Sequence, residues 1–153
     1  MIKKLLILGI IPASIFANEN KNENESAFME INVTVMTPLN VEVTEHVDFN
    51  NLILEKQQTK EGEFRVTGEP KGTYNILLRD GDSEIKDGVF YLKNTNDQNS
   101  TLPVNVDDSI TNRRFKLKKN GENKHNLKVA ATAHKDQEPG VYKGDLTIGV
   151  RYE

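Results

Sequence analysis

The stretch Ala27–Val43, AFMEINVTVMTPLNVEV, decides the fold. Every odd-numbered residue in it except Thr37 is apolar, and this period of two is typical of a β-strand with one buried face. The run is much longer than an ordinary strand of roughly 5–6 residues, and Pro38 divides it. The pattern therefore predicts two consecutive strands. It does not say in which molecule's core the first of them is buried.

The segment ahead of this stretch has the pattern of an export signal. Residues 1–17, MIKKLLILGIIPASIFA, combine a basic start, an apolar run and a terminal Ala17, as a secretory signal peptide does. The apolar run is too short to span a membrane, so we expect an exported protein with no membrane insertion. The alternative is an N-terminal anchor helix. Removing the 17 residues from 153 leaves 136, about one domain.

Composition excludes some classes of partner. The signal segment carries two of the 20 basic residues and none of the 23 acidic ones, so the mature chain has a net charge of −5. An acidic chain is poorly suited to nucleic acid or to an anionic membrane surface. The sequence has no cysteine, so an exported fold would depend on packing and hydrogen bonds instead of disulfides.

The remainder of the chain reads as many short strands. Residues 18–26, NENKNENES, are polar and of low complexity, which predicts a flexible leader. Turn residues then separate short apolar runs, and we expect strands over residues 29–36, 39–43, 47–54, 62–68, 73–80, 88–93, 101–106, 113–118, 125–133 and 142–152. Several short strands at this spacing predict an all-β sandwich or barrel.

The last predicted strand, within GVYKGDLTIGVRYE (140–153), places its apolar side chains on one face, with Gly144 in register: Tyr142, Leu146, Ile148, Val150 and Tyr152. An ordinary closing strand of any β-sandwich would show this pattern. The end of the chain also resembles subunits of chaperone–usher pili, which carry a glycine fourteenth from the end and a penultimate tyrosine. Gly140 and Tyr152 occupy those two places.

Two other stretches carry further resemblances. FRVTGEPKGTYNILL (64–78) and VDFNNLIL (47–54) are similar to a family of exported bacterial β-domains of unknown function, although Asn50 stands where that family usually has glycine. The front, INVTVMTPLNVEV, resembles the start of colonisation-factor fimbrial subunits.

These resemblances imply a fold and a way of assembling. The fold would be an immunoglobulin-like, pilin-type incomplete β-sandwich over residues 38–153, preceded by a candidate donor strand at 27–37 with groove-facing side chains Met29, Ile31, Val33 and Val35. Donor-strand exchange would complete each sandwich with the extension of a neighbouring copy. The alternative is a self-complete secreted β-sandwich that binds a glycan or a host protein, with residues 29–36 paired in their own sheet.

The resemblance also implies partners and a location. They are other copies or related pilus subunits, a periplasmic chaperone, an outer-membrane usher and a possible host receptor, for a protein that crosses the periplasm to the cell-surface fimbrium. The chaperone would contact the C-terminal residues Gly140, Tyr142, Leu146, Ile148, Val150, Tyr152 and Glu153. A mature chain of this length favours a shaft subunit over a tip adhesin, which usually has an additional receptor-binding domain.

Catalytic and metal-binding patterns are weak. The three histidines are scattered, and no serine has a convincing histidine and aspartate around it. RDGDSE (79–84) departs from the EF-hand pattern and predicts a hairpin turn. We therefore expect no enzyme, no cofactor and no metal site. RRFKLKK (113–119) predicts a strand with a basic outer face, with docking to an acidic patch of a neighbour as an alternative role.

Overall fold

The computed structural model describes Ala27 and residues 29–153. The predicted signal peptide (1–17) and leader (18–26) lie outside the described residues. The chain divides into two units, one ending at Thr34 and the other running from Val35 to Glu153, and each is described by itself. All strands named below belong to the second unit.

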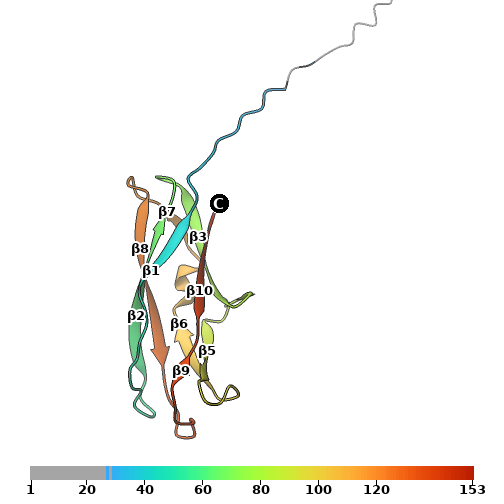
Figure 1. The fold of residues 1–153 in the computed structure, drawn as a ribbon. Coiled ribbons are helices and arrows are strands. Elements are labelled where there is room, and N and C mark those ends of the chain that lie inside the picture. Colours follow the sequence, from blue (N-terminus) through green and yellow to red (C-terminus); the bar gives the residue numbers. More distant parts are fainter. Residues whose placement is uncertain (1–26, 28) are drawn as a thin grey trace, which may run out of the picture. The chain divides into compact units, whose positions relative to one another are not determined.

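Two β-sheets form this second unit (Figure 1). The larger sheet has the order β1-β2-β8-β6-β5-β9, with bounds β1 Asn40–Glu45, β2 Gln58–Thr67, β8 Glu122–Ala131, β6 Thr101–Val106, β5 Val89–Asn94 and β9 Tyr142–Lys143. The smaller sheet consists of β10 (Leu146–Tyr152), β3 (Thr73–Asp80), β4 (Ser83–Glu84) and β7 (Arg114–Lys116), with the last two both paired to β3. All these strand pairs are antiparallel, and a 3-10 helix spans Asp108–Ile110.

The core lies between the two sheets. Alternate residues of each long strand are buried, as the period-two patterns predict. The smaller sheet contributes Tyr74, Ile76 and Leu78, and the larger sheet contributes Phe64, Val66, Phe90, Leu102, Val104, Val106, Leu127 and Val129. The prediction of an all-β sandwich is confirmed.

The strand predicted over residues 47–54 is wrong. Asn50 and Glu55 have positive φ angles of 53° and 59°, and the Asn50 N–H donates to Asp48 Oδ1 at 2.7 Å. These two turns keep the segment out of the sheets, apart from one isolated bridge between Leu54 and Ala133. Asparagine tolerates the left-handed conformation better than most residues. Asn50 therefore adopts the backbone conformation for which glycine is usually chosen.

The strand predicted over residues 142–152 is two strands. β9 belongs to the larger sheet and β10 to the smaller one, and Gly144 and Asp145 separate them. A Cβ atom on Gly144 would lie 2.8 Å from Cε1 of Phe90. The chain thus changes sheets where its backbone passes directly against the Phe90 ring, and only glycine leaves room for that approach.

The strand predicted over residues 29–36 does not form within this chain. None of the residues from Met29 to Leu39 lies in a strand, and β1 begins at Asn40. The alternation in this part of the sequence is consequently not used by the sheets that the structure describes.

His125 lies among aromatic side chains at the interior face of β8. Its Nε2 is 2.7 Å from the Tyr74 hydroxyl, and that hydroxyl also accepts a hydrogen bond from Asn123 Nδ2 at 2.9 Å. The Tyr74 proton is therefore available to an unprotonated Nε2. The other rings against His125 are those of Phe64, from β2, and Phe115, from β7, neither of which can carry a charge. Burial in this setting lowers the pKa of His125 below its usual value.

We expect acid to destabilise the fold through His125. Because the folded-state pKa is lower than the unfolded value of about 6.5, the unfolded chain binds the proton first. The contribution is fully present above about pH 6.5 and is lost as the pH falls toward the folded-state pKa. Urea unfolding at about pH 7.5 and about pH 5 should show this loss in the native sequence, and His125→Phe should reduce it. The exposed His46 supplies the control variant, His46→Phe, which should retain the loss. An undiminished pH dependence in His125→Phe would contradict the assignment.

Candidate functional site

One side of β10 has no partner strand among the described residues. β10 pairs with β3, and the opposite side of β10, here called the open edge, pairs with nothing in Val35–Glu153. The Glu153 N–H donates to the Thr73 carbonyl at 3.1 Å. In an antiparallel ladder the backbone groups of successive residues point to opposite sides. The backbone N–H and C=O groups of Ile148 and Val150 therefore point toward the open edge.

The side chains of β10 add an apolar surface at this edge. Its even-numbered side chains are half-buried against the core: Leu146, Ile148, Val150 and Tyr152. A sheet edge with unpaired backbone groups and apolar side chains is a template for another strand. The open edge therefore offers both the hydrogen bonds and the apolar contacts that an added strand needs.

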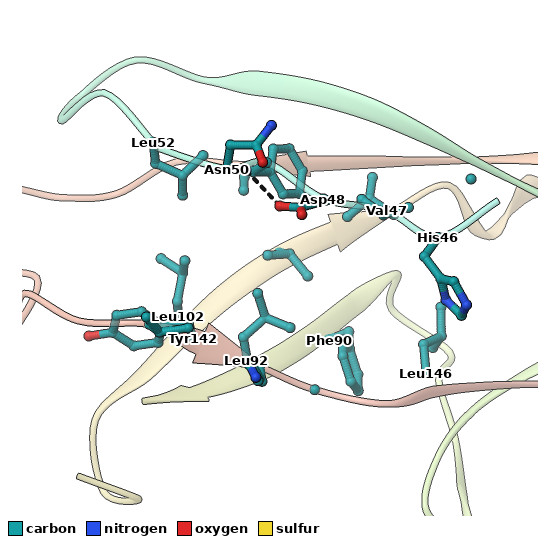
Figure 2. Close-up of a pocket in the computed structure, with 18 of the residues that line it drawn as sticks. His46, Val47, Asp48, Asn50, Leu52, Phe90, Leu92, Leu102, Tyr142 and Leu146 are labelled. Atoms are coloured by element: carbon teal, nitrogen blue, oxygen red, sulfur yellow. Dashed lines mark hydrogen bonds between the residues drawn. The ribbon is translucent and has the colours of Figure 1, made fainter. Parts of the chain in front are cut away.

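A cavity of about 1100 Å³ lies in the second unit and includes residues of this edge. It is lined mainly by apolar side chains of both sheets and by the irregular segment 46–54; Figure 2 shows Val47 and Leu52 of that segment on one side, and Phe90, Leu92, Leu102, Tyr142 and Leu146 on the other. Small-molecule pockets are typically roughly 300–1,000 Å³. The cavity is thus slightly larger than that range, and its mainly apolar lining suits an apolar polypeptide segment.

Polar side chains also line the cavity. They include His46, Asp48, Lys135, Glu138 and Asp145. Within Ala27 and residues 29–153, no group of three or more histidine, aspartate or glutamate residues is placed to hold a metal ion.

The predicted donor side chains are the most exposed large apolar residues of the described chain. Met29, Ile31, Val33 and Val35 are between 78% and 89% exposed. Single exposed apolar side chains are common on protein surfaces, whereas a row on alternate positions of one segment is typical of an interaction site. The exposure of these four side chains is therefore compatible with burial in a different copy of the protein. That role stays a prediction.

The C-terminal residues predicted to contact a chaperone fall in four places, the last of which is Glu153, directly after β10. Leu146, Ile148, Val150 and Tyr152 lie in β10, Tyr142 lies in β9, and Gly140 precedes β9. A Cβ on Gly140, whose φ is +152°, would lie 2.6 Å from the amide nitrogen of the buried Asn94, which explains the glycine by packing. Glu153 forms an ion pair with Arg114 and accepts a hydrogen bond from Asn75 Nδ2 at 2.6 Å. The chaperone contact itself stays a prediction.

Sequence reasoning missed most of the cavity wall. The strands predicted over residues 88–93 and 101–106 contain Phe90, Leu92 and Leu102, but the prediction did not indicate that these side chains face an unfilled space. The sequence predicts a strand over residues 47–54, and this prediction gives no sign that the segment belongs to the cavity wall. Val47 and Phe49, at alternate positions of this segment, are both partly buried against the core.

Comparison with known proteins supports the fold. No protein-family model matches the sequence, and the search of curated proteins found no match. A chain from the chaperone–tip adhesin complex of CFA/I fimbriae biogenesis aligns with a TM-score of 0.50 and 16% identity, over 75% of this chain and 41% of that one. The Salmonella SafD adhesin aligns with a TM-score of 0.36 and 10% identity, over 65% of this chain and 94% of that one, which is too low to carry an argument.

The fold is therefore an immunoglobulin-like β-sandwich, as predicted, and it is similar to the aligned part of the chain from the CFA/I complex. This chain spans about 41% of the length of the matched chain from the CFA/I complex. No helix of the described residues is long and apolar enough to cross a membrane.

Proposed function

We propose that this protein is an exported, non-enzymatic structural subunit of a bacterial surface fimbria, in which each copy lends its segment 27–36 to the cavity of the next copy. The observation that carries the proposal is the open edge of β10 beside an apolar cavity of about 1100 Å³, in a chain whose exposed extension has apolar side chains at alternate positions. The lent side chains are Met29, Ile31, Val33 and Val35.

The lengths of the two segments are compatible. Ten extended residues reach about 33 Å, and the seven residues of β10 span roughly 23 Å. The lent segment is therefore long enough to match the length of β10.

The expected energy is sufficient for a durable contact. Full burial of four aliphatic side chains contributes on the order of 6–12 kcal/mol, and each backbone hydrogen bond adds about 1 kcal/mol net. Ordering the segment costs about 1–2 kcal/mol per residue, which offsets much of this gain.

The direction of lending sets the type of assembly. A head-to-tail contact that does not close on itself produces a filament, built from identical copies or from related subunits. Pro38, between the lent segment and β1, has no N–H and so ends a strand ladder there.

The open cavity also implies partner proteins that cover it before assembly. An uncovered apolar cavity beside an unpaired edge favours aggregation, so a newly exported subunit needs a protein that covers it. We assign this role to a periplasmic chaperone that contacts β10, followed by transfer at an outer-membrane usher to the cell surface. The domain boundaries that belong to this proposal are a signal peptide at 1–17, a leader at 18–26, the candidate donor strand at 27–37, of which residues 27–36 are lent, and the sandwich at 38–153.

The test removes the lent segment. A mature chain without Ala27–Met36 should still fold with a chaperone of this class, because the sandwich residues from β1 onward are intact, but it should not form filaments in electron micrographs. Added to the full mature chain, the shortened subunit should end filament growth, since it has a cavity but no segment to lend. Filaments made by the shortened chain alone would rule out the lending role. A stable, soluble monomer of the full mature chain, without a chaperone, would favour the self-complete sandwich that binds a glycan or host protein.

A further inference from the structure

Thr37, at the base of the extension, is held by two separate parts of the sandwich. Its carbonyl accepts a hydrogen bond from the Tyr152 hydroxyl at 2.6 Å. Its N–H and its hydroxyl both donate to Glu69 Oε2, at 3.0 Å and 2.8 Å. These two donors lower the pKa of the Glu69 carboxyl below its ordinary value, with the backbone N–H as the larger cause. Three of the polar groups of one residue are thus bonded at the point where the extension begins.

Tyr152 and Glu69 are joined to each other as well. The Glu69 N–H donates to the Tyr152 hydroxyl at 2.7 Å, so that this hydroxyl both accepts and donates. Thr37, Glu69 and Tyr152 therefore form a closed ring of hydrogen bonds, here called the root clamp. A closed ring restrains each member more than three separate bonds would, because no member can move without loosening the other two.

Two glycines make the space that the tyrosine ring occupies. A Cβ on Gly68 would lie 2.5 Å from the Tyr152 hydroxyl oxygen, and a Cβ on Gly72 would lie 2.9 Å from Tyr152 Cε1. Both glycines belong to the turn between β2 and β3, in the motif VTGEPKG (66–72). In Figure 1 the start of β1 and the end of β10 lie at the same end of the sandwich as this turn. The two glycines of this motif thus leave the space that the Tyr152 side chain occupies.

We infer that Tyr152 is a positioning residue that fixes the root of the lent segment to the strand whose open edge receives the neighbouring copy's segment. The same strand, β10, then carries the receiving edge and holds the base of the outgoing extension. The consequence for a filament rests on the proposed function. The lent segment leaves its own sandwich at Thr37, and the root clamp holds this joint between successive copies. The filament is stiff because the joint cannot pivot at Thr37.

Tyr152→Phe tests the clamp itself. This change keeps the ring in its slot and removes only the hydroxyl, so it loses both the bond to the Thr37 carbonyl and the bond from the Glu69 N–H. Amide exchange of the peptide that contains Thr37, followed by mass spectrometry on the folded mature chain as filament or as monomer, should accelerate about tenfold, as expected for the loss of roughly one net hydrogen bond. Tyr91→Phe is the matched control, since Tyr91 is exposed, and it should leave this rate unchanged.

A second variant guards against misfolding of the first. Glu69→Ala removes the carboxylate that accepts the hydrogen bond from the Thr37 N–H. The change leaves the core intact, and it should also accelerate Thr37 exchange. An unchanged Thr37 rate in both variants overturns the clamp, whatever the filaments do.

The filament measurement separates this inference from the proposed function. Filaments of Tyr152→Phe should form in normal number but with a persistence length several-fold shorter than those of the native sequence. If the native sequence forms filaments and those of Tyr152→Phe have the same persistence length, the root clamp does not stiffen the joint between copies. The proposed function would still hold. Absence of filaments from the native sequence itself overturns the proposed function, and the exchange rates still decide the clamp.

Discussion

Replacing both Ile31 and Val33 with aspartate should abolish filament formation without harming the subunit. Both side chains are about 80% exposed in the described chain, so the changes remove nothing from the core of the sandwich. In the neighbour's cavity the same positions would each lose about 1.5–3 kcal/mol of apolar burial and would place an unpaired carboxylate among apolar side chains. We expect the affinity between subunits to fall by at least about a thousandfold, measured by sedimentation and by filament counts in electron micrographs.

The neighbouring positions provide a matched control. Asn32→Asp with Thr34→Asp adds the same two charges to the same segment, but on the alternate face, which points away from the cavity in a paired strand. This control should still polymerise. Equal loss of filaments in both double variants would mean that charge alone, and not burial of one face, controls assembly.

Moving the segment to the other end of the same chain should convert the subunit into a stable monomer. In this variant residues 27–36 are deleted from the front and joined after Glu153 through a short glycine-rich turn. A tight turn after β10 brings the following strand back antiparallel along the open edge, where it fills the chain's own cavity. Size exclusion should then show monomers with no filaments.

The thermal stability of this variant should rise strongly. If the net gain is about 4 kcal/mol after ordering costs, and each kcal/mol raises the Tm of a domain of this size by about 4 °C, the Tm should rise by about 15 °C relative to the chain that lacks the segment. The same fusion with Ile31→Asp and Val33→Asp should lose nearly all of this gain. A fusion that melts at the same temperature as the shortened chain would show that the cavity does not accept the segment.

Much of the fold followed from local sequence patterns. The strands over 73–80 and 101–106 were predicted with the bounds that the structure has, because strict alternation and flanking turn residues coincide there. The all-β sandwich followed from the number and spacing of such runs. The half-buried face of β10 was likewise readable from the alternation between Leu146 and Tyr152.

Other features depend on contacts that a local pattern does not record. Alternation in residues 47–54 suggested a strand, but the left-handed backbone at Asn50 and Glu55 ended it. The break at Gly144 arises from the Phe90 ring, about fifty residues earlier in the chain. The cavity could not be predicted either, because alternation marks a side chain as inward-facing whether or not anything covers it. The root clamp joins Thr37 to Tyr152, at opposite ends of the sandwich sequence.

The most direct test of the lending of residues 27–36 asks whose cavity the segment enters. The sequence has no cysteine, so Val33→Cys and Ile148→Cys can be combined in one chain and joined by a short thiol-reactive crosslinker. If the segment is lent, the crosslinker joins different copies, and a denaturing gel shows a ladder of covalent dimers, trimers and longer chains. A single internally bridged monomer, with no ladder, would mean that the segment completes its own sandwich.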